Sequence, residues 1–192
     1  QTHWAPAKSG AHCKLVGNDE SHWHCQSDEQ CTNDDSGWHC MYGIAADSQS
    51  NSFGIATGDA LQTVMSLKAR VSHVQWVESG EAVSYGLHRT LNQRSCIATL
   101  PIGYADGLPR GLWSSGEVLI GGKRRSFAGV ITMDQVMINC ESDDVQVGDE
   151  AVLIGQQGDF QITANDWARQ MGTIGYEIVC GISARVPRNY LR

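Results

Sequence analysis

Seven side chains within the first 45 residues, those of four cysteines and three of the five histidines, are candidates to form disulfides or bind a metal ion. They are Cys13, Cys25, Cys31 and Cys40, with His22, His24 and His39. Four cysteines in a short acidic segment are typical of two disulfides in an oxidising compartment, with three possible pairings. Thiolates and imidazoles also bind zinc, but the Cys-x11-Cys-x5-Cys-x8-Cys spacing differs from that of a standard zinc finger. We therefore expect disulfides, with zinc or an unstructured tail as the alternatives.

The segment that must position these residues has almost no aliphatic side chains. It cannot bury enough apolar surface to offset its ordering entropy, so it needs a disulfide or metal staple. Residues 18–25 recur as residues 33–40 with six of eight positions identical, which indicates an internal repeat. We expect a Cys/His-rich segment over residues 1–45, followed by a polar junction over residues 46–63.

From residue 64 onward the sequence has the pattern of strands. Apolar stretches between glycine turns predict strands at 64–77, 97–102, 117–120, 127–131, 136–140, 150–154 and 174–182. Thr163, Asp166 and Gly172 have the spacing of an N-cap, its capping-box acid and a C-cap, so a helix is expected between them. The fold class is expected to be mainly β: an antiparallel, barrel-like domain over residues 64–192 with one or two short helices, preceded by the Cys/His-rich segment.

Charge and hydropathy exclude two classes of partner. The net charge of −7 argues against nucleic acid, because its phosphates require clustered Lys and Arg. The basic run Lys123-Arg124-Arg125 follows Gly121-Gly122 and is expected to be one exposed strand after a tight turn. No apolar run approaches the ~18 residues of a transmembrane helix, so no membrane span is expected. Gln1 begins the chain without the layout of a signal peptide, and we expect an excerpt or a processed product.

A series of motifs from residue 53 to residue 188 follows a known family order. The motifs are Phe53-Gly54-Ile55-Ala56, Met65-Ser66-Leu67-Lys68-Ala69-Arg70-Val71, Val83-Ser84-Tyr85-Gly86, Pro101-Ile102-Gly103-Tyr104-Ala105-Asp106-Gly107, Thr132-Met133-Asp134-Gln135, Leu153-Ile154-Gly155, Ile174-Gly175-Tyr176-Glu177 and Arg185-Val186-Pro187-Arg188. With these motifs, residues 53–192 resemble the C-terminal part of alanine racemases, enzymes of fold type III that use pyridoxal phosphate (PLP). The resemblance covers about 70% of the chain and makes residues 46–63 a junction with a remnant of the last barrel strand.

The resemblance implies a role for each matched residue. Tyr85 would be the catalytic tyrosine, which exchanges the substrate's α-proton on one face. Four residues would meet the substrate or line the mouth of the site: Met133 through its backbone at the substrate carboxylate, with Tyr104, Arg110 and Asp134 around it. Three would contact the cofactor phosphate: Gly54 and Ile55 through their backbone, and Tyr176.

Racemisation explains why these residue types are needed. A proton leaves Cα and another returns to the opposite face, so two bases must flank the carbon, while PLP serves as the electron sink. In the family a lysine bonded to PLP serves one face and the tyrosine serves the other. Gly86 after Tyr85 allows the backbone to approach a ligand closely. The alternative for Tyr85 is a strand tyrosine packed for its ring.

Several family features are missing. None of the four lysines, Lys8, Lys14, Lys68 and Lys123, has the context of the PLP lysine, and the residues before the β-domain are too few for an eight-stranded barrel. Two arginines of the family are replaced, one by Ser52 and one by Val130. PLP is thus expected as cofactor by family but without covalent attachment to this chain.

The resemblance also suggests how an incomplete chain could act. The family's active site forms between subunits, so this chain could supply Tyr85 to a barrel-bearing partner or act as part of a homodimer. The substrate would be alanine, with serine as a further possibility, and the location cytoplasmic. The alternatives are a non-catalytic β-domain interaction module fused to a secreted disulfide-rich or zinc-binding segment, and a secreted metal-binding or disulfide-rich protein.

Overall fold

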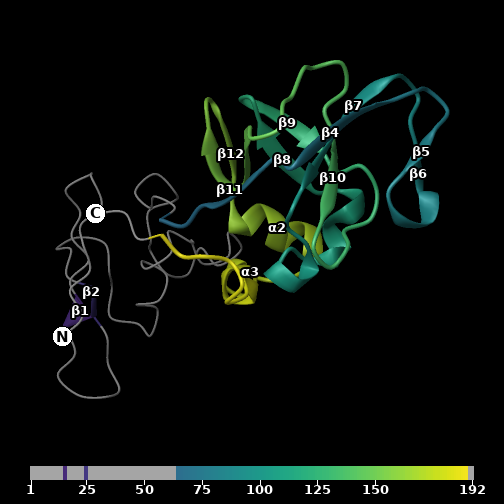
Figure 1. Ribbon diagram of the computed structural model, residues 1–192. Helices are drawn as coiled ribbons and strands as arrows, with labels where there is room; N and C mark the ends of the chain where they lie inside the picture. Colours follow the sequence, from purple (N-terminus) through teal and green to yellow (C-terminus); the bar gives the residue numbers. More distant parts are fainter. Residues whose placement is uncertain (1–14, 17–23, 26–63, 190–192) are drawn as a thin grey trace. The chain divides into compact units, whose positions relative to one another are not determined.

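The computed structural model describes residues 15–16, 24–25 and 64–189 (Figure 1). Within the first two ranges, β1 (Leu15–Val16) pairs antiparallel with β2 (His24–Cys25). Residues 65–187 form a compact unit that contains all the other elements. None of the helices in the described ranges has the length and apolar character needed to cross a bilayer.

The compact unit consists mainly of short strands with turns and two α-helices. Its strands are β3 (Leu67–Arg70), β4 (His73–Val77), β5 (Ala82–Val83), β6 (Arg89–Thr90), β7 (Ser95–Leu100), β8 (Glu117–Ile120), β9 (Lys123–Ser126), β10 (Val136–Asn139), β11 (Glu150–Gln157) and β12 (Phe160–Ile162). Its helices are the 3-10 turns η1 (Tyr85–Leu87), η2 (Tyr104–Asp106) and η3 (Arg110–Ser114), and the α-helices α2 (Ala164–Met171) and α3 (Gly175–Gly181).

Two antiparallel sheets form the core. One has the order β10-β7-β4; the other has the order β12-β11-β8-β9, with β3 paired to β11. All six residues of the central strand β7 are buried, as are residues 151–155 of β11. Strands buried on both faces read as continuous apolar runs, which is the pattern of Ile97–Leu100 and Ala151–Ile154 in the sequence.

The β5–β6 ribbon is separate from both sheets and carries the turn η1 between its strands. In Figure 1 this ribbon projects from the sheets on the side away from α3, and η1 is the short coil below its labels. Helix α2 packs against α3 and η3. The η1 turn therefore lies apart from α3.

The predicted fold class is confirmed: the domain is mainly β, antiparallel and has two short α-helices. The described strands pair as separate sheets, without a closed ring of hydrogen-bonded strands. The predicted strand 64–77 is two strands, β3 and β4, which pair with different neighbours. The predicted strand 127–131 is reduced to one bridge between Phe127 and Ile138, after which the chain leaves the sheet.

The predicted strand 174–182 is wrong, because this segment is the helix α3. Ile174, Ile178 and Ile182 are spaced four residues apart, which is the helical period. Of these, Ile178 and Ile182 are buried and Ile174, at the N-cap position, is exposed. The β-branched side chains suggested a strand, but packing against α2 determines the conformation.

The basic run forms the predicted strand after a tight turn, with one exception to its exposure. Gly121 and Gly122 both have positive φ, 63° and 70°, as a two-residue turn of this hairpin type requires. Lys123 and Arg124 are exposed, whereas Arg125 is buried and pairs with Asp143. This run is therefore a structural hairpin strand.

The described cysteines are free thiols: Cys96 and Cys140 are buried and Cys180 is exposed. Burial and the neighbouring Cys96 raise the pKa of the Cys140 thiol to about 11. The predicted disulfides involve other cysteines, whose side chains lie outside the described residues.

Helix α2 has the predicted caps. Thr163 Oγ1 accepts the N–H of Asp166 at 3.1 Å, and Asp166 Oδ2 accepts the N–H of Thr163 at 2.7 Å. Burial raises the pKa of Asp166, but hydrogen bonds from Thr163 and Arg169 outweigh it, so the pKa lies below its ordinary value. A carboxyl with a lowered folded-state pKa contributes stability that is lost as the pH falls through the acid range. Gly172 ends the helix at φ 68°.

We predict that Thr163→Ala lowers the free energy of unfolding by about 1 kcal/mol at neutral pH, because the first turn of α2 loses its side-chain acceptor. Urea denaturation followed by circular dichroism measures the change. Thr163→Ser is the matched control, since it keeps the hydroxyl and should stay near the wild type. Equal destabilisation by Ala and Ser would show that the hydroxyl does not cap the helix.

Candidate functional site

Tyr85 lies in a strained turn at the end of the β5–β6 ribbon. Tyr85 is 80% exposed, which is unusual for a large aromatic residue. The residue before it, Ser84, has φ 71° and ψ 169°, a conformation that is essentially restricted to glycine. Gly86 and Leu87 also have positive φ, 77° and 52°. Strain of this kind clusters at functional sites, so the turn makes Tyr85 a candidate functional residue.

Several contacts hold this turn against segment 126–130. Ser84 Oγ donates a hydrogen bond to the carbonyl oxygen of Val130 at 3.1 Å. The half-buried guanidinium of Arg89 donates to the carbonyl oxygen of Phe127 at 2.8 Å. On its other side, the ring of His88 lies 6.3 Å from the ring of Trp113 in η3. The turn that carries Tyr85 is therefore held by contacts with two other segments, residues 126–130 and η3.

Tyr104 and Met133 lie together because two turns share hydrogen bonds. The N–H of Tyr104 donates to the carbonyl oxygen of Thr132, and the N–H of Ala105 donates to that of Met133, both at 3.0 Å. Gly103 permits this approach, since a Cβ there would collide with the carbonyl oxygens of Thr132 and Met133. The side chains of Tyr104 and Met133 are 47% and 51% exposed, so both are available to a ligand or a partner.

Asp134 is joined to the same turn by Arg185. Arg185 Nη2 lies 2.6 Å from Asp134 Oδ1, and its Nε lies 3.3 Å from Asp106 Oδ1. The largely buried Asp106 also accepts the N–H of Gly103 at 2.9 Å. The hydrogen bond to Asp134 and the nearby Asp106 carboxylate raise the pKa of Arg185 above its ordinary value. This guanidinium thus connects the turn of Tyr104 with the turn of Met133 and Asp134.

The other predicted site residues have different positions. Arg110 begins η3 and is exposed. Tyr176 lies half-buried on α3, whose C-terminal end reaches η2 through the hydrogen bond from the N–H of Ser183 to the carbonyl oxygen of Asp106. Gly54 and Ile55 lie outside the described residues, so their predicted contact with the cofactor phosphate stays a prediction.

One segment, residues 126–135, links most of these groups. Its first half receives the hydrogen bonds from Ser84 and Arg89, and its second half receives those from Tyr104 and Ala105. Asp134 near its end binds Arg185. The structure therefore brings Tyr85, Tyr104, Met133 and Asp134 to a common support, while their roles stay predictions.

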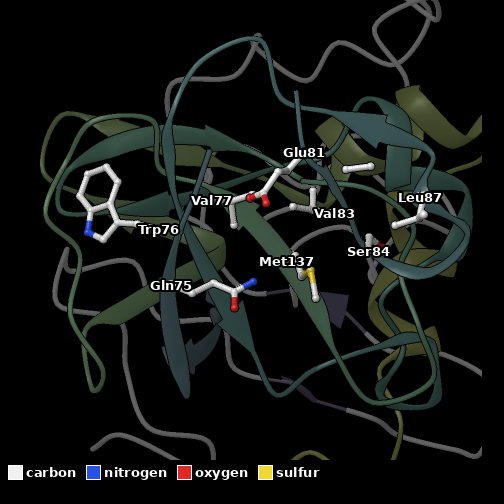
Figure 2. Close-up of a pocket in the computed structure, with 9 residues that line it drawn as sticks. Gln75, Trp76, Val77, Glu81, Val83, Ser84, Leu87 and Met137 are labelled. Atoms are coloured by element: carbon white, nitrogen blue, oxygen red, sulfur yellow. The ribbon is translucent and has the colours of Figure 1, made fainter. Parts of the chain in front are cut away.

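An open groove of about 510 Å³ lies next to the Tyr85 turn. Figure 2 shows Val77, Val83 and Met137 in its middle, Ser84 and Leu87 at one end and Trp76 at the other. Glu81 is its acidic lining residue. The groove is open, so it does not have the enclosing shape of a site that buries most of a small ligand's surface.

The predicted metal alternative cannot be placed in the described structure. Its candidates Cys13, Cys31, Cys40, His22 and His39 lie outside the described residues, and only the backbone of His24 and Cys25 is described. Among the residues that are described with their side chains, no group of three His, Cys, Asp or Glu could hold a metal ion. The expectation of disulfides or zinc in residues 1–45 stays a prediction.

Comparison with known proteins assigns the β-domain. The family described as "Alanine racemase, C-terminal domain" matches residues 64–190. The chain belongs to the alanine racemase family. The alanine racemase of Symbiobacterium thermophilum is 50% identical over 149 residues, which are 77% of this chain and 40% of that protein. That of Halothermothrix orenii is 50% identical over 68% of this chain and 35% of its own length.

Solved alanine racemase structures have the same fold. The enzyme from Bacillus anthracis with bound L-Ala-P has a TM-score of 0.73 at 40% identity, over 80% of this chain and 38% of its own. The enzyme from D-cycloserine-producing Streptomyces lavendulae has a TM-score of 0.72 at 40% identity, over 79% of this chain and 39% of its own. This chain thus spans about two fifths of the length of the alanine racemases it matches.

Sequence reasoning did not identify Ser84, Asp106 or Arg185 as site residues. The signal for Asp106 was its position three residues after Gly103, which is the spacing of a capping acid. Arg185 and Ser84 were visible only as members of matched motifs. Their roles depend on the backbone conformation at residue 84 and on contacts over long sequence distances, which local patterns do not reveal.

We predict that Arg185→Ala accelerates hydrogen exchange of the Gly103 and Ala105 amides about 5-fold. The effect is modest because the Arg185 guanidinium is exposed and screened by solvent, and it is measurable because Asp106 is largely buried. Hydrogen-exchange NMR on the full chain measures both amides. Arg94→Ala is the matched control, since Arg94 pairs at 2.9 Å with the exposed Glu78 away from these turns. Unchanged exchange in Arg185→Ala would contradict the bridging role.

Proposed function

We propose that this chain provides the tyrosine-bearing part of an alanine racemase active site, which a barrel-bearing chain completes. The observation that supports this most directly is Tyr85, held 80% exposed by a strained turn in a domain of the alanine racemase family. A tyrosine kept for core packing would be buried and its turn relaxed. An exposed, oriented phenol is instead suited to meet a reacting group that another chain presents.

The proposed chemistry is the interconversion of L- and D-alanine. PLP, when bound, would supply the electron sink that makes the α-proton removable. Tyr85 would take or return that proton on one face of Cα, and a base on the partner would serve the other face. The Met133 backbone would meet the substrate carboxylate, while Tyr104, Arg110 and Asp134 would line the mouth.

The described residues fit the covering part of such a site and do not supply a lysine for the cofactor. Lys68 Nζ pairs with Glu150 at 3.0 Å and Lys123 Nζ pairs with Asp143 at 2.9 Å. Both lysines lie on strands of the sheet around β11, whereas the Tyr85 turn belongs to the separate β5–β6 ribbon. Tyr176 is the described candidate for the cofactor phosphate, together with Gly54 and Ile55 outside the described residues.

The partner is proposed to be a barrel-bearing chain or a second copy in a homodimer. Alanine is the proposed substrate, with serine as a further possibility, and the cytoplasm is the proposed location. The alternative, a non-catalytic module fused to a secreted segment, draws no support from the relatives cited above, which are alanine racemases by name.

We predict that Tyr85→Phe lowers α-proton exchange by about 100-fold or more, because the variant keeps the ring and loses only the proton-carrying oxygen. Deuterium wash-in at Cα of alanine is measured in a mixture of this chain, a barrel-bearing racemase fragment and PLP. Tyr104→Phe is the matched comparison and should act mainly on the apparent KM. Equal exchange by wild type and Tyr85→Phe, with association intact, would remove Tyr85 from the catalytic role.

We also predict that the chain alone does not become labelled stoichiometrically by PLP. After reduction with borohydride, peptide mapping should find at most trace label spread over the lysines, because the ion pairs of Lys68 and Lys123 do not form a cofactor site. A complete alanine racemase treated in the same way is the positive control. One lysine of this chain labelled to one equivalent would overturn the proposal that the cofactor belongs to a partner.

A further inference from the structure

Gly129 approaches Ser84 closely, and neither of these two residues is among the predicted site residues. Gly129 is buried and has φ 96°, and it lies one residue before Val130, whose carbonyl oxygen accepts the Ser84 hydroxyl. A Cβ built on Gly129 would overlap the Ser84 Cβ and lie 2.8 Å from Ser84 Oγ and 3.4 Å from the carbonyl oxygen of Val83. Ser84 thus occupies the space that a side chain at position 129 would need.

Ser84 needs this support because its backbone is strained. Its φ of 71° and ψ of 169° lie where only glycine is at ease, so the conformation persists only if surrounding contacts determine it. The hydroxyl bond to Val130 and the fit against Gly129 act on the same side chain from adjacent residues. Both contacts come from segment 126–135, which also carries Met133 and Asp134.

The dihedral angles of Ser84 set the direction of Tyr85. Tyr85 follows directly in the chain, and its exposed side chain has no core contact to hold it independently. A rotation at Ser84 therefore moves the Tyr85 side chain, and the displacement is largest at the phenol oxygen at its end. Displacements of about 1 Å are enough to reduce a reaction rate by about 100-fold.

We propose that Gly129 and Ser84 form a positioning pair for Tyr85: the missing side chain of Gly129 seats Ser84 in its strained conformation, and this directs the phenol out of the domain. The catalytic consequence rests on the proposed function, whereas the conformational consequence does not. Neither residue touches the substrate in this scheme, and both act through Tyr85.

Gly129→Ala and Gly148→Ala form a matched pair of variants. Gly148 has φ 97°, nearly that of Gly129, but a Cβ there would have nothing within 4 Å. Both substitutions therefore place a side chain at nearly the same positive φ, and only Gly129→Ala adds the collision with Ser84. We expect Gly129→Ala to shift the backbone amide resonances of residues 84–88 in NMR spectra of the full chain, while Gly148→Ala leaves them at their wild-type positions.

Ser84→Gly provides a suppressor. It removes the Cβ that collides, and glycine tolerates the φ and ψ of residue 84. Adding Gly129→Ala to Ser84→Gly should therefore leave the resonances of residues 85–88 nearly unchanged, and the double variant should fold even if Gly129→Ala alone does not. A double-mutant cycle in melting temperature should show coupling between the two positions and none between Ser84 and Gly148.

The kinetic measurement uses the mixture with a barrel-bearing racemase fragment and PLP. We expect Gly129→Ala to lower the rate of α-proton exchange by about 100-fold with little change in the apparent KM, and Gly148→Ala to keep the wild-type rate. Wild-type resonances for residues 84–88 in folded Gly129→Ala, or additive effects of Gly129→Ala and Ser84→Gly, would overturn the positioning pair. Shifted resonances with no exchange by any form, wild type included, would support the pair and overturn the proposed function instead.

Discussion

The site depends on the backbone of residues 126–135, which leaves the sheet after Phe127 and presents its carbonyl oxygens to the neighbouring turns. A strand would have used these acceptors within a sheet. Because the chain leaves the ladder, the carbonyls of Phe127, Val130, Thr132 and Met133 are available to Arg89, Ser84, Tyr104 and Ala105. Phe127 and Val130 are buried and their backbone acceptors must be paired, so the requirement that satisfies this part of the segment also holds the Ser84 and Arg89 ends of the Tyr85 turn.

The interactions around residues 126–135 differ in how firmly they hold their partners. The neighbouring strands β7 and β10 are paired over four positions with β7 fully buried, which gives the segment a rigid base. The loops attached to it are held by single hydrogen bonds and partly exposed ion pairs, each of modest energy. A rigid sheet that carries the exposed Tyr85 and Tyr104 on weakly held loops suits a surface whose side chains adjust to a partner while its backbone stays in place.

The sequence was informative where local chemistry decides the conformation. The caps at Thr163 and Gly172, the Gly121-Gly122 hairpin and the buried strand at 150–154 follow from rules that act over a few residues, and the structure has all three. The strand expected at 174–182 failed because β-branched residues at helical spacing fit both states, and packing against α2 decides between them. The strained turn at Ser84 could not be predicted, because a serine in the sequence gives no indication of a positive φ.

The candidate site residues were assigned from the motif order and not from periodicity. Tyr85, Tyr104 and Asp134 have ordinary neighbours in the sequence, and only the fold shows that one segment supports them all. The ion pair that completes the arrangement joins residues far apart in the sequence, because Arg185 lies 51 residues after Asp134.

That separation has a consequence for the order of events during synthesis. Ribosomes add about 5–20 residues per second, so the two carboxylates emerge several seconds before the guanidinium that joins them. During that interval the sheets can form and the Tyr104 turn can rest on residues 132–133, but the aspartates face solvent without their cation. The mouth of the site is thus among the last parts of the domain to be completed, because the two carboxylates wait for a guanidinium that follows every core strand and both α-helices in the chain.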